Sequence, residues 1–215
     1  MKRLDMRENR APGFLITFCG LDGCGKTTMM ERLTNDLKKD FDVFTTKQPT
    51  SNVRRSDIFR TYMDCPNHDA FDYRSLSLLA ASDRVQHVSK VIAPALESGR
   101  IVLSDRYFYS CLANLRARGF KTDKWIYEIA EYIIKPDIAF FFDIPVETAV
   151  ERVRSRPAEK ERYIDMELQY RLRDEYIDIC NSNGGILIST LQKEDECYSI
   201  VRRAVGEVIS NGHIR

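Results

Sequence analysis

The chain has 215 residues, of which 43% are hydrophobic and 30% charged, a composition typical of one soluble globular domain. Its 33 basic residues balance 32 acidic ones, which gives no reason to expect a nucleic-acid or membrane partner. The polar, basic start lacks the apolar core of a signal peptide, and six scattered cysteines without a C-x-x-C pair favour reduced thiols. We therefore expect a cytoplasmic protein with a single domain over residues 1–215 and a flexible N-terminus over residues 1–12.

Short apolar runs alternate with amphipathic segments along the chain. Runs dense in Ile, Val, Leu and Phe are typical of buried parallel strands, and they fall at residues 14–19, 43–46, 101–104, 138–143 and 186–189. We expect helices at residues 27–40, 75–97, 125–134, 146–153 and 166–183. Strands separated by helices predict a three-layer α/β fold with a central parallel sheet of about five strands and helices on both faces. Ligands bind such sheets at the carboxyl ends of the strands.

A glycine-rich loop follows the first predicted strand. Residues 20–27 read Gly-Leu-Asp-Gly-Cys-Gly-Lys-Thr, a full match to the phosphate-binding loop of P-loop proteins. Its glycines let backbone N–H groups turn toward phosphate oxygens, and the following helix adds its positive N-terminal dipole. Lys26 should reach the β- and γ-phosphates of ATP, and the Thr27 hydroxyl should ligate Mg²⁺. The predicted cofactor site comprises Gly20, Gly23, Cys24, Gly25, Lys26, Thr27 and Thr28.

Asp105 and Arg106 come directly after the third predicted strand, at the edge of the sheet that carries the phosphate loop. The carboxylate can hold Mg²⁺ or its waters, and the guanidinium can grip an acceptor phosphate with paired hydrogen bonds. Asp105 and Thr27 are thus the predicted metal ligands.

Taken together, these segments resemble the thymidylate kinase family of P-loop nucleoside monophosphate kinases. The matching pieces are residues 18–28 (FCGLDGCGKTT), 46–50 (TKQPT), 81–87 (ASDRVQH), 92–96 (IAPAL) with Gly99, 104–107 (SDRY) with Ser110 and Ala113, Pro136-Asp137, and an arginine-rich segment ending at Arg162-Tyr163. They occur in the family's order from about residue 14 to 190. The resemblance implies ATP-dependent phosphorylation of dTMP to dTDP by a homodimer that packs through the helix at residues 75–97.

The resemblance also implies the roles of further residues. Asp22 would face the sugar of the acceptor or the metal, Arg84 would hydrogen-bond the acceptor base, and Arg60 would help to clamp the acceptor phosphate. The expected substrate-binding set is Asp22, Gln48, Pro49, Arg60, Arg84, Arg106, Ser110 and Asn114.

Residues 152–162 contain five basic residues and are similar to a mobile lid. Phosphoryl transfer needs positive charge on the migrating group and exclusion of water, and lid arginines supply both on closure. We expect Arg154 and Arg156 to act in this way, although a basic run is commonly a solvated helix face. The expected catalytic set is Lys26, Asp22, Asp105, Arg106, Arg154 and Arg156. No general base is required, since the acceptor is already a phosphate anion.

The sequence departs from the family pattern around the acceptor base. Ala80 occupies the position of a stacking phenylalanine, Asn114 and Leu115 that of a tyrosine and glutamine, and Cys19 that of a carboxylate. Losing an aromatic platform removes roughly 1–3 kcal/mol of stacking unless another ring replaces it, and Phe108, Tyr109 and Tyr73 are the candidates. The acceptor could therefore be another pyrimidine or a modified nucleoside monophosphate. A nucleoside kinase is disfavoured because it needs a general base near the sugar, and a non-catalytic nucleotide-binding module remains a third alternative.

Overall fold

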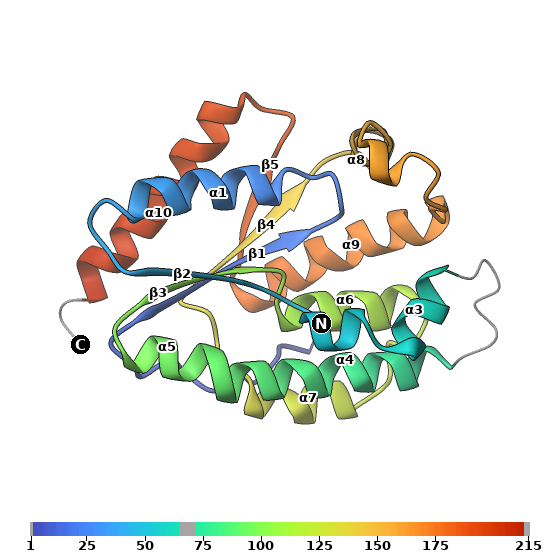
Figure 1. Ribbon diagram of the computed structural model, residues 1–215, viewed down its shortest axis with the longest axis horizontal. Coiled ribbons are helices and arrows are strands. Elements are labelled where there is room, and N and C mark those ends of the chain that lie inside the picture. Colours follow the sequence, from blue (N-terminus) through green and yellow to red (C-terminus); the bar gives the residue numbers. More distant parts are fainter. Residues whose placement is uncertain (1, 65–71, 213–215) are drawn as a thin grey trace.

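A computed structural model describes residues 2–64 and 72–212 of the chain. Its centre is a five-stranded sheet in the order β2-β3-β1-β4-β5, with every neighbouring pair parallel (Figure 1). The strands are β1 (Phe14–Gly20), β2 (Val43–Lys47), β3 (Ile101–Asp105), β4 (Ile138–Asp143) and β5 (Ile186–Ser189). The expected α/β fold is thereby confirmed.

Helices cover both faces of the sheet. Helices α1 (Lys26–Leu37) and α10 (Glu194–Gly212) lie on one side, and α4 (Tyr73–His87), α5 (Ala93–Glu97), α6 (Phe108–Ala117) and α7 (Trp125–Ile129) lie on the other (Figure 1). Helix α9 (Met166–Asn183) packs against α6 and β4. The remaining segments are α2 (Ser51–Arg54), α3 (Asp57–Asp64), η2 (Val88–Ile92, a π-helix), η3 (Ala130–Tyr132), α8 (Val146–Arg154) and η4 (Pro157–Glu159).

The burial of each strand follows its place in the sheet. The central strands β1 and β3 are buried along their whole length, which explains their continuous apolar sequences. The edge strands β2 and β5 alternate between buried and more exposed positions. Phe18 lies 5.7 Å from Phe140 and 6.0 Å from Phe142 between ring centroids, so aromatic side chains join β1 to β4 within the core.

Two long helices were not expected from the sequence. Helix α6 has eight buried residues among its ten, so it is apolar on nearly every side and lacks the amphipathic period of a surface helix. Helix α10 does carry such a period, with Cys197, Val201, Val205 and Ile209 buried at four-residue spacing.

The N-terminal segment differs from the flexible tail that we expected. Leu4 and Met6 are buried, and the backbone of Arg7 exchanges hydrogen bonds with Ile133 (2.9 Å) and Lys135 (2.7 Å). Burial of the two apolar side chains offsets the entropy lost when the segment is ordered. Among the described residues, no helix is both long and apolar enough to cross a membrane.

Candidate active site

The phosphate loop connects the end of β1 to the start of α1 and depends on left-handed backbone at its glycines. Gly23 has φ 85°, and a Cβ there would lie 2.2 Å from the carbonyl oxygen of Ala149. Gly25 caps α1 with φ 91°. Side chains at these two positions would be strained, so glycine is needed for the loop to turn its N–H groups inward.

Lys26 is folded back over this loop and is only 5% exposed. Its Nζ donates to the carbonyl oxygens of Gly20 (3.1 Å) and Leu21 (2.5 Å). Within the described part of the chain, no carboxylate pairs with this ammonium group. Its charge is therefore available to an anion held by the loop.

Asp105 ends β3 beside the loop and keeps one oxygen without a partner. Its Oδ2 pairs with Lys47 Nζ at 2.8 Å, whereas its buried Oδ1 has no hydrogen-bond partner among the described residues. Such an oxygen fits a metal ion or its water. Thr27 and Thr28, in the first turn of α1, have exposed side chains. The described residues contain no group of three or more His, Cys, Asp or Glu side chains that could hold a metal ion by themselves.

Arg106 adopts backbone that is uncommon outside glycine, with φ 65°. Two hydrogen bonds hold this bend: Arg106 N donates to Phe18 O (2.8 Å), and Ser104 Oγ donates to Arg106 O (2.7 Å). Local strain of this kind persists only where surrounding contacts fix it, and it is common at functional sites.

The Arg106 guanidinium is fixed by groups from three separate elements. Its Nη2 donates to Asp22 Oδ1 (2.5 Å), and its Nη1 donates to Tyr176 Oη (3.0 Å) and to Gly20 O (3.3 Å). Tyr176 lies on α9 and in turn donates to Ser110 Oγ at 3.0 Å. The loop, β3 and α9 therefore meet at this one arginine.

Asp22 is surrounded by positive charge. The Arg106 guanidinium, followed by Lys26 and Arg162, holds the pKa of its carboxyl group well below the usual range despite an opposing effect of burial. Arg162 Nη1 approaches Asp22 Oδ2 at 3.4 Å and also pairs with Glu159 Oε2 at 3.2 Å. Asp22 thus remains ionised between an arginine from β3 and one from the predicted lid.

The predicted lid, residues 152–162, is the end of α8, the short turn η4 and an irregular return. Arg154 and Arg156 have exposed side chains, and within the described ranges neither contacts the phosphate loop. Arg162 is the lid residue that reaches it. From the sequence, Arg162 was expected only to end the arginine-rich lid segment, with no catalytic role.

Side chains of α4 hold the end of β2 and the segment that follows it. Asp83 accepts hydrogen bonds from Thr50 N (2.8 Å) and Thr50 Oγ1 (2.5 Å). His87 lies between Thr46 Oγ1 (2.9 Å) and Gln48 Nε2 (3.1 Å), and burial lowers its pKa. These contacts give His87 a structural role, and the backbone N–H of Gln48 donates to Asp105 O at 3.0 Å, which holds Gln48 beside the end of β3.

Three arginines, from α2, α3 and α4, differ in their surroundings. Arg84 is 3% exposed and donates to the carbonyl oxygens of Ala80 (2.8 Å) and Tyr107 (3.4 Å). Arg60 has an exposed side chain on α3. Arg54, which is not among the expected site residues, donates to Pro49 O at 2.9 Å. Burial, then the charge of Arg106, lowers its pKa. Arg54 therefore joins the cationic groups around Arg106.

Ser110 and Asn114 lie one turn apart on α6, and Ser110 is buried whereas Asn114 is partly buried. Asn114 Nδ2 donates to Ser110 O (2.9 Å), and its Oδ1 accepts from Arg118 Nη1 (2.9 Å). Cys19, at the position of the family's carboxylate, is fully buried, and burial raises the pKa of its thiol to about 12. This position therefore contributes no negative charge to the site.

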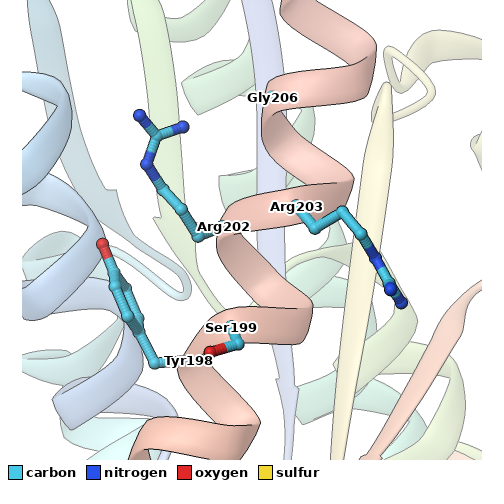
Figure 2. Close-up of a pocket in the computed structure, with 5 residues that line it drawn as sticks. All are labelled: Tyr198, Ser199, Arg202, Arg203 and Gly206. Atoms are coloured by element: carbon cyan, nitrogen blue, oxygen red, sulfur yellow. The ribbon is translucent and has the colours of Figure 1, made fainter.

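A separate pocket lies along α10 and is lined by Tyr198, Ser199, Arg202, Arg203 and Gly206. Figure 2 shows that Arg202 and Arg203 leave the helix on different sides, so their guanidinium groups do not converge on one ligand. The convergent polar groups lie instead at the carboxyl ends of β1 and β3, the position that parallel sheets use for ligands.

Comparison with known proteins identifies the family. Residues 18–199 match the thymidylate kinase family. A probable thymidylate kinase from Thermococcus gammatolerans is 34% identical over 206 residues, covering 92% of this chain and 99% of the relative. One from Thermococcus kodakarensis is 37% identical over 170 residues (76% and 82%), and the thymidylate kinase of a Geobacillus species is 34% identical over 207 residues (92% and 98%). With the phosphate loop, the Asp105-Arg106 pair and a match over most of its length, the chain belongs to the thymidylate kinase family of nucleotide phosphotransferases.

Proposed function

We propose that the protein transfers the terminal phosphoryl group of ATP to dTMP, giving ADP and dTDP. The observation that carries this proposal is the fixed Arg106 guanidinium, which contacts the phosphate loop at Gly20 and Asp22 and directly follows Asp105 in the chain. An arginine in this position suits a phosphate-bearing acceptor, because its planar fork matches the phosphate oxygens.

The donor side would use the loop of residues 20–28. Backbone N–H groups and Lys26 would bind the donor phosphates, and the Lys26 ammonium would exchange its carbonyl partners for phosphate oxygens. Thr27 and Asp105 would hold Mg²⁺, which when bound neutralises charge on the phosphates. Residues of this chain then act by positioning and electrostatics, as phosphoryl transfer requires.

The acceptor side would lie between Arg106 and α6. Arg106 and Arg54 would bind the acceptor phosphate, with Arg60 as a further cation on α3. Asp22 would face the acceptor sugar or the metal, while Gln48, Pro49, Arg84, Ser110 and Asn114 would surround the nucleoside. An oxygen of the acceptor phosphate attacks the terminal phosphorus atom of ATP, and the bond to the ADP oxygen breaks.

Closure of residues 152–162 would complete the site. Arg162 already contacts Asp22, and Arg154 and Arg156 lie nearby in sequence on an exposed segment. Movement of this segment toward the loop would bring their charge to the migrating phosphoryl group and exclude water.

A homodimer packed through the α4–α5 region is part of this proposal. Leu78 and Val91 are 45% and 37% exposed on this helical layer, and apolar side chains of this size favour burial in an interface. Sedimentation equilibrium of the protein and of Leu78→Asp tests it. A dimer that the substitution dissociates supports the arrangement, and a monomeric wild-type protein rejects it.

The catalytic proposal is tested by ADP release from ATP-Mg²⁺ with dTMP, dUMP, dCMP, AMP, GMP and thymidine as separate acceptors. Preference for dTMP supports the proposed activity. Preference for another pyrimidine nucleotide would favour the second candidate, an altered acceptor, for which Ala80 and Asn114 give the specific reason. ATP binding without turnover of any acceptor would favour the nucleotide-binding module instead.

A further inference from the structure

Helix α4 holds the end of β2 and its connection to α2 at two points. His87 contacts Thr46 Oγ1 and Gln48 Nε2 where β2 ends. Asp83 accepts two hydrogen bonds from Thr50, the residue before α2. Asp83 and His87 are four residues apart in α4, so their side chains lie on one face of the helix. The start of α2 therefore takes its position from α4 as well as from the sheet.

Both oxygens of the Asp83 carboxylate are used on Thr50. Oδ2 accepts from Thr50 N at 2.8 Å, Oδ1 accepts from Thr50 Oγ1 at 2.5 Å, and Asp83 is only 9% exposed. Thr50 in turn caps α2, because its Oγ1 accepts from Asn52 N (3.3 Å) and its carbonyl oxygen accepts from Arg54 N (3.1 Å). Asp83 thus fixes the cap of α2 through both its backbone and its side chain.

Helix α2 is too short to hold a position by itself. It contains four residues, and a helix of one turn does not recover the cost of its own nucleation. Ser51 and Asn52 have exposed side chains, whereas Val53 is 4% exposed. The position of α2 therefore depends on the burial of Val53 and on the two hydrogen bonds from Thr50 to Asp83.

Arg54 is the last residue of α2, and its side chain lies on the acceptor side of the site. Its Nε donates to Pro49 O at 2.9 Å, and its Nη1 and Nη2 have no hydrogen-bond partner within residues 2–64 and 72–212. Burial, then the charge of Arg106, lowers its pKa, so its partly buried guanidinium lies close enough to interact with that of Arg106. The next residue, Arg55, has an exposed side chain. Two amino groups of Arg54 are therefore available to oxygens of a phosphate bound beside Arg106.

We propose that Asp83 is a positioning residue for acceptor binding: by holding Thr50 it fixes α2 and keeps the Arg54 guanidinium where it can bind the acceptor phosphate together with Arg106. The proposal rests on the proposed function, in which these two arginines bind that phosphate. Asp83 acts from a distance, because both of its oxygens are occupied by Thr50. An arginine held in place loses less entropy when the phosphate binds, so Asp83 affects affinity for the acceptor more than the transfer step.

The first test measures kcat and KM for dTMP and for ATP in the wild-type protein and in Asp83→Ala. Loss of two hydrogen bonds to a carboxylate should raise KM for dTMP roughly 10- to 30-fold and change kcat and KM for ATP by no more than about twofold. Asp83→Asn should restore KM for dTMP to within about threefold of the wild type, because its amide can accept from Thr50 N and donate to Thr50 Oγ1.

A double-mutant cycle with Arg54→Met separates positioning from a general effect on the fold. Arg54→Met removes the guanidinium, so adding Asp83→Ala to it should raise KM for dTMP by no more than about twofold further. Thr50→Val removes the hydroxyl contact alone, and it should raise KM for dTMP about threefold in the wild type and leave it unchanged in the Arg54→Met background. Arg55→Met removes the exposed neighbouring arginine and should leave KM for dTMP unchanged.

Asp137→Ala is the matched control for a loss of stability. Asp137 Oδ2 also accepts from one backbone N–H, that of Leu15 (2.8 Å), and from one side chain, Asn9 Nδ2 (2.7 Å). It precedes β4 at the end of the sheet opposite the phosphate loop. Asp137→Ala should therefore lower the melting temperature without raising KM for dTMP.

The proposal requires KM for dTMP to rise in Asp83→Ala and in Arg54→Met, with effects that do not add in the double variant. An unchanged KM for dTMP in either variant, an equal rise for ATP, an equal rise in Asp137→Ala, or additive effects overturn it. Thr50→Val decides if Asp83→Ala does not fold. A wild-type protein without turnover of any nucleotide rejects the proposed function and this inference together, whereas turnover with additive effects rejects the inference alone.

Discussion

Replacing Tyr176 with phenylalanine removes a single hydroxyl group from α9 and leaves the ring in place. That hydroxyl accepts from Arg106 Nη1 at 3.0 Å and donates to Ser110 Oγ at 3.0 Å, and Tyr176 is only 4% exposed. Arg106 Nη1 keeps one other partner, Gly20 O, at the longer distance of 3.3 Å. Tyr176 is thus a positioning residue that acts through Arg106.

The expected loss in kcat/KM follows from the positive charge of the Arg106 donor. A hydrogen bond to a charged group contributes about 1.5–3 kcal/mol, and the remaining Gly20 contact should restrict the loss to the lower end of that range. About 1.5 kcal/mol corresponds to about a tenfold decrease in kcat/KM for the nucleoside monophosphate. KM for ATP should stay constant, because no donor-side residue is altered.

Steady-state kinetics with each substrate varied in turn measure this effect. Tyr170→Phe is the matched control, since Tyr170 lies on the same helix and also loses one hydroxyl contact, to Glu147, but has an exposed side chain. A structural effect alone would lower activity in parallel for both substrates. An unchanged kcat/KM for the acceptor in Tyr176→Phe, or an equal change in Tyr170→Phe, would refute the reasoning.

Three further predictions concern folding and the phosphate loop. Gly23→Ala should lower the free energy of unfolding by about 2 kcal/mol or more and weaken ATP binding. Gly99→Ala is the control, because Gly99 also has a positive φ (80°) but nothing within 4 Å of a new Cβ, so it should show only the backbone strain. Equal decreases in melting temperature for the two variants would contradict this prediction. The pKa of Asp22 is depressed from its usual value of 3.8, so its charge stabilises the fold above about pH 4 and this contribution declines as the pH falls further. The free energies of unfolding of the wild type and Asp22→Asn, measured in urea, should therefore differ more at pH 7 than at pH 3. Glu175→Gln should cost about 3 kcal/mol in urea unfolding at pH 7, because the substitution leaves Arg116, now paired at 2.5 Å, without its buried carboxylate; a loss below about 1 kcal/mol would contradict it.

The strands were predictable because each is a short apolar run with abrupt ends. Because the carboxyl ends of parallel strands lie at one edge of a sheet, the predicted strands also place Gly20 and Asp105 at the same edge. The predicted ends of the first and third strands, residues 19 and 104, agree to within one residue with Gly20 and Asp105, where β1 and β3 end. Helix α6 gave no comparable signal, because eight of its ten residues are buried and Ser110 and Asn114 alone do not make a polar stripe strong enough to mark the period.

The surroundings of Arg106 were harder to predict. Tyr176 lies 70 residues from Arg106 in the chain, and only the packing of α9 on α6 brings its hydroxyl to the guanidinium. Arg54 and Arg162 were each one of several arginines in a basic segment, and composition does not reveal which of them turns inward. Sequence patterns locate a strand end to within a residue, whereas the direction of a long side chain depends on tertiary contacts.

The hydrogen bonds from Asp83 and His87 have a mechanical consequence. They tie the end of β2 and the segment that follows it to α4 at Thr46, Gln48 and Thr50. Gln48 is also tied to β3, because its backbone N–H donates to Asp105 O at 3.0 Å. The position of the Gln48 side chain relative to Arg106 is therefore set jointly by α4 and by the two strands, so a substitution that repacks α4 against the sheet should alter the acceptor side of the site without touching a residue that binds substrate.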